Sequence, residues 1–147
     1  MIEKQYHNRI IHGDSALLLR EVPAEIVDSI VTSPPYYAQR DYAVEGQVGT
    51  EDTPEKYISR LVNTFRECKR LLKPGGTLWL NLGDKYIDGS LLGMPWRVAL
   101  ALKDDGWILR NDIIWHKPNA MPHSAKNRLT VDHEYIFFFV KNDSDYY

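Results

Sequence analysis

The chain has 147 residues, 44% of them hydrophobic and 26% charged, which is the composition of one globular domain with a real core. Eighteen basic and 20 acidic residues give a net charge of −2, so the strongly basic footprint of many nucleic-acid-binding proteins is absent. A single cysteine excludes an internal disulfide and a cysteine-rich metal cluster, and no apolar run is long enough to cross a bilayer, so we expect a cytoplasmic protein with no metal site.

The N-terminal third predicts a β-α-β unit. Arg9 to His12 is a candidate strand, Asp14 or Ser15 can cap a short helix through Leu19, and the apolar run Ile26 to Val31 is a second, buried strand. This order predicts a parallel pair of strands.

The second strand leads into the turn Thr32-Ser33-Pro34-Pro35-Tyr36-Tyr37. Each proline fixes its own φ and restricts the residue before it, so the turn is stiff. It places hydrogen-bond acceptors beside an aromatic ring at the carboxyl end of a strand, where α/β sheets bind ligands. Such a turn suits a planar group that carries an exocyclic NH₂, although a proline-rich loop with a core tyrosine is the plain alternative.

The middle of the chain predicts a long loop and a helix. Residues 38–52 form a loop that is long for a compact domain, so it is either functional or mobile. Thr53-Pro54-Glu55 is a helix start, and Pro74-Gly75-Gly76 ends that helix. Cys68 falls on its apolar face and is interpreted as a core residue rather than a nucleophile.

The last part predicts three more strands and one helix. These are a strand over Thr77 to Leu82, a helix over Leu91 to Leu102, and strands over Trp107 to Trp115 and Glu134 to Val140. Because only the loop His116 to Asp132 separates the final two strands, we expect them to pair antiparallel.

An ordered set of motifs resembles the DNA amino-methyltransferases, which transfer a methyl group from S-adenosylmethionine (SAM) to cytosine N4 or adenine N6. The set comprises Thr32 to Tyr37 and, around it, His12-Gly13-Asp14-Ser15, Leu78 to Asp84, Pro95-Trp96-Arg97, Ile113 to Asn119 and His133 to Ile136. The resemblance covers nearly the whole chain. It implies an α/β, Rossmann-like mixed sheet, mostly parallel with an antiparallel last strand, flanked by helices, with residues 1–147 as the catalytic part of the domain.

The resemblance also implies roles for the turn. Ser33, Pro34, Pro35 and Tyr36 would be catalytic: the Ser33 hydroxyl and the Pro34 carbonyl accept the amino hydrogens, and Tyr36 stacks on a base flipped out of double-stranded DNA. Cofactor contacts would come from Asp14, Thr32 and Ser33. For Asp14, a helix cap is the competing interpretation.

Candidate DNA contacts are Tyr37, Arg40, His116, Lys117, Lys126 and Arg128. The alternatives are a solvated loop for the basic residues near His116, a surface ion pair of Arg40 with Asp41, and a proton-accepting role for His116. Asn81 and Asp84 could line the pocket or only end a strand. For His133-Glu134 we expect a structural tie.

One departure from the family is large, because the Phe-x-Gly-x-Gly turn that binds SAM is absent. Gly75-Gly76 follows a helix, which is the wrong context. We therefore expect the catalytic half of a permuted enzyme, with the SAM loop and target-recognition region elsewhere, either in a longer protein or in a second subunit. Serine at the first motif position favours cytosine N4 over adenine N6. A non-catalytic module that binds DNA or a partner chain, and a protein-glutamine methyltransferase, are the alternatives.

Overall fold

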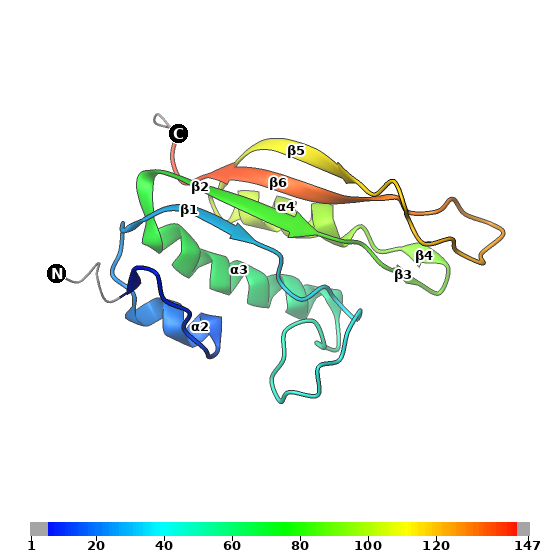
Figure 1. The fold of residues 1–147 in the computed structure, drawn as a ribbon, viewed down its shortest axis with the longest axis horizontal. Helices are drawn as coiled ribbons and strands as arrows, with labels where there is room; N and C mark the ends of the chain where they lie inside the picture. Colours follow the sequence, from blue (N-terminus) through cyan, green and yellow to red (C-terminus); the bar gives the residue numbers. More distant parts are fainter. Residues whose placement is uncertain (1–5, 144–147) are drawn as a thin grey trace.

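The computed structural model describes residues 6–143 and centres on a four-stranded sheet with the order β1-β2-β6-β5 (Figure 1). The strands are β1 (Val27–Thr32), β2 (Leu72–Leu82), β5 (Ile108–His116) and β6 (His133–Val140). β1 pairs parallel to β2, and β6 pairs antiparallel to both β2 and β5. The mixed α/β sheet and the antiparallel final pair are therefore confirmed.

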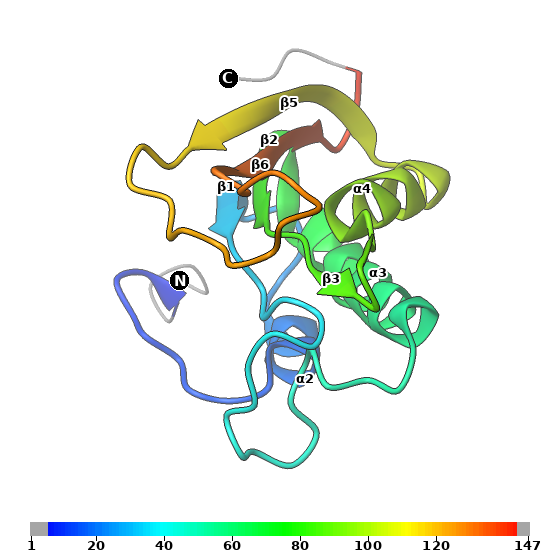
Figure 2. The same ribbon diagram turned by 90° about the vertical axis from the view of Figure 1, so that its right-hand side faces the viewer.

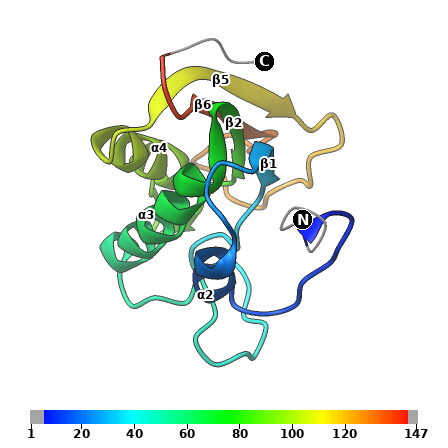
Figure 3. The ribbon, with the colours of Figure 1, turned by 90° about the vertical axis from the view of Figure 1, so that its left-hand side faces the viewer.

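Two long helices cover the same face of this sheet (Figures 2 and 3). They are α3 (Pro54–Leu71), which connects β1 to β2, and α4 (Met94–Asp104), which precedes β5. The smaller elements are α2 (Ser15–Leu18), a 3₁₀ helix (Leu19–Glu21) and the hairpin β3 (Tyr86–Ile87) and β4 (Ser90–Leu91). None of the helices within residues 6–143 is long and apolar enough to span a membrane.

The core lies between the sheet and these two helices. Alternate residues of a strand point to opposite faces, and Leu78 and Leu80 of β2 and Phe137 and Phe139 of β6 are fully buried on the helix side. Cys68 of α3 joins this cluster, where burial raises the pKa of its thiol to about 12. The thiol is a core group, as expected.

The other face of the sheet has little cover among the described residues. On it Trp79 stacks on Phe138 with ring centroids 4.3 Å apart. Val31 is 80% exposed and Trp115 is 56% exposed. The strand leading into Ser33 was expected to be buried, but it is the edge strand of this sheet, and Val31 lies outside the core.

Three local expectations were wrong. Arg9 to His12 forms no strand, so the parallel partner of β1 is β2. The helix expected from Leu91 begins at Met94, because Leu91 pairs with Tyr86 in the β3–β4 hairpin. The strand expected over Thr77 to Leu82 begins at Leu72, directly after α3, so Pro74-Gly75-Gly76 lies inside β2, where the register with β1 shifts between Val27 and Ser29.

Candidate active site

The carboxyl ends of β1 and β2 and the start of β6 lie at the same end of the sheet, and the Ser33–Tyr36 turn follows β1 there. β1 ends at Thr32, directly before the turn, and Asn81 is one residue from the end of β2. Because β6 runs against β2, its second residue, Glu134, lies at this same end. The topology therefore brings a serine, a tyrosine, an amide and a carboxylate together.

The hydroxyl of Tyr36 is the centre of a hydrogen-bond network. It accepts from Ser33 Oγ at 3.1 Å and from Asn81 Nδ2 at 2.8 Å, and it donates to Glu134 Oε2 at 2.9 Å. Asn81 Nδ2 also donates to Glu134 Oε2 at 2.8 Å. Lys117 pairs with the other oxygen, Oε1, of Glu134. One carboxylate thus gathers the turn, β2 and the loop after β5.

The protonation states in this network follow from its electrostatics. Burial raises the pKa of Tyr36 to about 12, and the neighbouring Glu134 carboxylate acts in the same direction. Burial alone would raise the pKa of Glu134, but hydrogen bonds from Lys117, Asn81 and Tyr36 outweigh it, so that pKa lies below its usual value. At neutral pH, Tyr36 keeps its proton and Glu134 is ionised.

The turn keeps two acceptors available. The Pro35 carbonyl accepts from the Tyr57 hydroxyl of α3 at 2.9 Å. Among the described residues, no donor reaches the Pro34 carbonyl, and Ser33 Oγ uses its hydrogen on Tyr36. The Ser33 oxygen and the Pro34 carbonyl can therefore each accept a hydrogen bond from a ligand.

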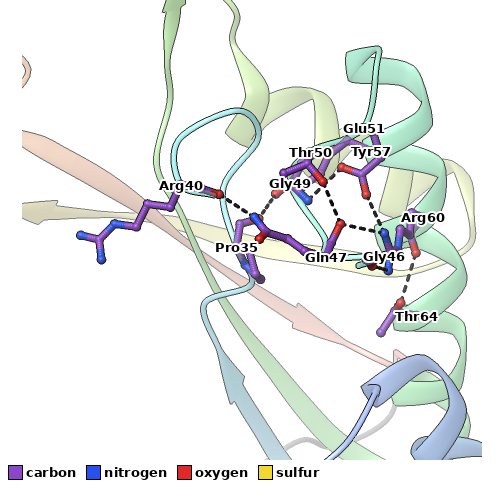
Figure 4. A network of polar contacts seen from close by, with 10 residues as sticks. All are labelled: Pro35, Arg40, Gly46, Gln47, Gly49, Thr50, Glu51, Tyr57, Arg60 and Thr64. Carbon is purple, nitrogen blue, oxygen red and sulfur yellow. Dashed lines mark hydrogen bonds and ion pairs between the residues drawn. The ribbon is translucent and has the colours of Figure 1, made fainter. Parts of the chain in front are cut away.

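The loop after the turn is tied to α3 (Figure 4). The Arg60 guanidinium donates to the carbonyls of Gly46 and Gln47 and pairs with Glu51 at 3.1 Å. The N–H of Gly49 donates to the same Glu51 carboxylate at 2.8 Å. Gly49 has φ +98°, and a Cβ there would lie 2.8 Å from the Tyr36 carbonyl, so this close approach requires glycine.

Ser33 lines two hollows of different character. A polar one of about 470 Å³ is lined by the turn residues 33–36 together with Arg40, Lys117 and Glu134. An apolar one of about 510 Å³ lies on the less covered face of the sheet, where Trp79 and Trp115 form part of its wall. The hydroxyl therefore stands between a polar and an apolar space.

The structure brings the four catalytic candidates together, and it separates the cofactor candidates. Thr32 and Ser33 line the apolar hollow. Asp14 caps α2 by accepting from the N–H of Ala16 at 2.7 Å, so the helix-cap interpretation describes its contact. Asp14 also lines a further hollow together with Pro35.

One of the DNA-contact expectations requires correction. Tyr37 is only 7% exposed and packs on Tyr57 with ring centroids 5.6 Å apart, so its ring is a core group and is not available to DNA. Lys117 pairs with Glu134 beside the turn, and its side chain is 43% exposed, so its contact with DNA stays a prediction.

The other DNA candidates lie on the surface. The side chain of Arg40 extends away from the network around Arg60 (Figure 4). His116 Nε2 is 4.0 Å from Asp132. In the loop between β5 and β6, Lys126 is exposed, and Arg128 contacts His123 and lies 3.7 Å from the centroid of the Tyr86 ring. These side chains are distributed around the polar hollow and along the loop, and no contact joins them into one cluster.

Two parts of the site were not anticipated. Tyr57 lies on the apolar face of α3, and the one signal it carried was a polar hydroxyl in a buried helical position. Glu134 was expected to be a structural tie, and its carboxylate does join Asn81 and Lys117, but its direct contact with Tyr36 was not anticipated. Asp84, a candidate for the pocket, accepts from the N–H of Met94 at 3.0 Å and caps α4. Within residues 6–143, no group of His, Cys, Asp and Glu is arranged to hold a metal ion.

The fold is that of a methyltransferase catalytic core. The structure resembles the PvuII DNA methyltransferase, described as cytosine-N4-specific, with a TM-score of 0.76 and 25% identity over 90% of this chain and 49% of that one. It also resembles a Thermus thermophilus protein solved in complex with S-adenosyl-L-methionine, with a TM-score of 0.72 and 29% identity over 90% of this chain and 54% of that one.

Residues 27–147 match the DNA methylase family N6_N4_Mtase, and the chain belongs to this family. Type II methyltransferase M.SmaI of Serratia marcescens is 43% identical, covering 95% of this chain and 58% of the relative. Type II methyltransferase M.XycI of Xanthomonas campestris pv. cyanopsidis is 42% identical, covering 94% and 56%. The chain therefore spans little more than half the length of these relatives.

Proposed function

We propose that this chain carries the catalytic turn of a DNA amino-methyltransferase, and that the whole protein methylates the exocyclic amino group of a flipped-out base, with cytosine N4 as the favoured target. The observation that carries the proposal is the pair of available acceptors, Ser33 Oγ and the Pro34 carbonyl, at the carboxyl end of β1. An aromatic amine is a poor nucleophile because its lone pair is delocalised into the ring. Two acceptors for its hydrogens favour a pyramidal nitrogen whose lone pair is available to react.

The polar hollow suits the base. Its walls are the turn and the paired charges of Lys117 and Glu134, while Tyr36 presents the ring on which a base would stack. Stacking on an aromatic side chain contributes on the order of 1–3 kcal/mol per base, which offsets part of the cost of leaving the duplex. Arg40, His116, Lys126 and Arg128 are the side chains we assign to phosphate contacts. With chromosomal DNA as the substrate, we expect the protein to act in the cytoplasm.

S-adenosylmethionine is the cofactor that we assign, and when bound it supplies an electrophilic methyl group. The described residues fit part of it: Thr32 and Ser33 line an apolar space beside the acceptor pair, and the Asn81 Oδ1 atom on that side is buried with no described partner. Thr32, Ser33 and Asn81 would orient the cofactor and exclude water. Asp14 lines a different hollow, beside Pro35, and its contact with the cofactor stays a prediction.

The glycine turn for the cofactor and the target-recognition region are left to a further segment or a second subunit. The chain spans little more than half the length of these Type II methyltransferase relatives, and we assign to that segment the apolar face of the sheet, where it would close over the cofactor space. The expected setting is a restriction–modification system. Two functions remain as alternatives. The same acceptor pair could serve adenine N6, and a chain that lacks its complement would be a non-catalytic subunit that binds DNA or a partner.

The test is transfer of a labelled methyl group from SAM to unmethylated DNA by the complete protein, followed by digestion to nucleosides and mass spectrometry. We expect N4-methylcytosine, whereas N6-methyladenine would correct the target base. The variant Ser33→Ala should reduce transfer more than it reduces SAM binding. A protein that binds SAM and DNA but deposits no methyl group would refute the proposed function, and equal loss of binding and transfer in Ser33→Ala would assign Ser33 a structural role.

A further inference from the structure

A continuous chain of hydrogen bonds connects the Glu134 carboxylate to the oxygen of Ser33. Its two links are the Tyr36 hydroxyl to Glu134 Oε2 at 2.9 Å and the Ser33 hydroxyl to Tyr36 Oη at 3.1 Å. All three groups belong to the polar hollow. The protonation state of the Glu134 carboxylate can therefore affect Ser33 Oγ, the atom that would accept from the base.

The Glu134 carboxylate determines which group donates in each of these two hydrogen bonds. An ionised carboxylate only accepts, so the single hydrogen of the Tyr36 hydroxyl is donated to Glu134. The Tyr36 oxygen must then accept, and it does so from Asn81 and from Ser33. The Ser33 hydrogen is thereby directed to the Tyr36 oxygen, and the Ser33 lone pairs remain for a ligand.

We propose that Glu134 is a positioning residue that, acting through Tyr36, fixes the Ser33 hydroxyl as a hydrogen-bond acceptor for the amino group of the target base. This inference rests on the proposed function. A serine hydroxyl that rotates freely can also donate to the amine lone pair, which is the electron pair that must attack the methyl group. Holding the Ser33 hydroxyl in one orientation prevents this unproductive donation to the amine lone pair.

The carboxylate also strengthens Ser33 as an acceptor. Hydrogen bonds in series polarise one another, and the charge at the end of this series draws both hydrogens toward itself. The Ser33 oxygen becomes more negative without carrying a charge of its own. Lys117 binds the other oxygen of Glu134, which keeps the carboxylate ionised and leaves Oε2 to Tyr36 and Asn81.

A purely structural role for Glu134 predicts different behaviour. Glu134 also links Asn81 of β2 and Lys117 of the loop after β5, so it could matter only by holding these segments together. In that case its loss would act independently of the Tyr36 hydroxyl. The two roles are separable by a double-mutant cycle between Glu134 and Tyr36.

The experiment compares Glu134→Gln, Tyr36→Phe and the double variant in the complete protein, by single-turnover methyl transfer to DNA. The amide keeps the size of the carboxylate but can donate to Tyr36, which permits the opposite direction of the chain. Tyr36→Phe keeps the ring and removes the link. Since a hydrogen bond to a charged group contributes roughly 1.5–3 kcal/mol, we expect each single variant to slow transfer about 10- to 100-fold, with unchanged affinity for SAM.

The double variant should be no slower than Tyr36→Phe alone. Losses of rate that multiply in the double variant, or an unchanged rate in Glu134→Gln, would overturn the inference while the proposed function stands.

If the wild-type protein transfers no methyl group, the proposed function fails, and titration of the Tyr36 phenol still tests the hydrogen bond between Tyr36 and Glu134. Glu134→Gln should lower the pKa of Tyr36 from about 12, and an unchanged pKa would overturn the inference.

Discussion

The Tyr57 hydroxyl of α3 donates to the Pro35 carbonyl at 2.9 Å, across 22 positions of sequence. Tyr57 is 1% exposed, so this hydrogen bond is made inside the core. It ties the middle of the Ser33–Tyr36 turn to α3, the longest helix among the described residues. The position of the acceptor pair therefore depends on the packing of α3 as well as on the two prolines.

Tyr57→Phe removes this bond and keeps the ring. We expect a loss of about 1 kcal/mol in the free energy of unfolding, because the Pro35 carbonyl is left without a partner, and a slower methyl transfer because the turn is less firmly held. Chemical denaturation and single-turnover transfer measure the two effects. Tyr42→Phe, at a 54% exposed tyrosine, is the control and should change stability little. Equal stability of the two variants would contradict the role of the Tyr57 hydroxyl.

Tyr36→Ala removes the ring on which we expect the base to stack. Loss of one stacking contact should weaken capture of the flipped base by about 1–3 kcal/mol, which is roughly 5- to 150-fold in affinity. Fluorescence of 2-aminopurine at the target position reports base flipping directly. Unchanged capture and unchanged turnover would remove Tyr36 from the base site.

Gly83→Ala tests the packing beneath the Tyr36 ring. A Cβ at Gly83 would lie 2.6 Å from Tyr36 Cε2, so the ring must shift. We expect slower transfer with little change in SAM affinity. In a Tyr36→Ala background the space is open, and the same glycine substitution should then cost nothing further. If Gly83→Ala slows transfer further in the Tyr36→Ala background, the substitution acts through the backbone at Gly83 and not through the Tyr36 ring.

Acidification should weaken the fold through Glu134. Its pKa in the folded chain lies below the reference value of 4.5, so its ionised form adds stability above that pH, and the contribution is lost as the pH falls through the folded pKa. Thermal unfolding from pH 7 to pH 3 should show a steeper decline for the wild type than for Glu134→Gln. Parallel profiles would mean that the carboxylate adds no pH-dependent stability.

The surface basic residues predict a salt-dependent effect on DNA binding. Lys126→Ala should weaken binding uniformly across DNA sequences and reduce the slope of log affinity against log salt by about 1. A salt titration of DNA binding by the complete protein measures both. Lys103→Ala, in the last turn of α4 and remote in sequence from the turn, is the matched control. Identical slopes for wild type and Lys126→Ala would remove Lys126 from the interface.

The sequence predicted the elements whose signals are local. The Thr53 cap and Pro54 located the start of α3, and the lack of a helix signal between β5 and β6 predicted their antiparallel pairing. It did not predict that Arg9 to His12 stay outside the sheet, because a short apolar run has the same pattern whether or not a neighbouring strand edge is available.

In the candidate site, too, the sequence predicted the contiguous residues and missed those that are distant in sequence. The turn itself is contiguous, so its four residues could be recognised in order. Glu134 and Tyr57 lie 98 and 22 positions from their partners in the turn, and only the fold brings them there. Tyr37 follows the turn directly, yet packing places its ring in the core, which adjacency in sequence could not show.

The anchored turn has a consequence for base selection. The Tyr57 hydroxyl and the two prolines hold the backbone of the turn, and Ser33 uses its hydrogen on Tyr36, so Ser33 Oγ and the Pro34 carbonyl are both left as acceptors. Cytosine and adenine present amino hydrogens to such a pair, whereas thymine presents a carbonyl oxygen, which the same two oxygens repel. If the proposed function holds, we expect this rigidity to help reject thymine, since a serine free to rotate could donate to the thymine carbonyl.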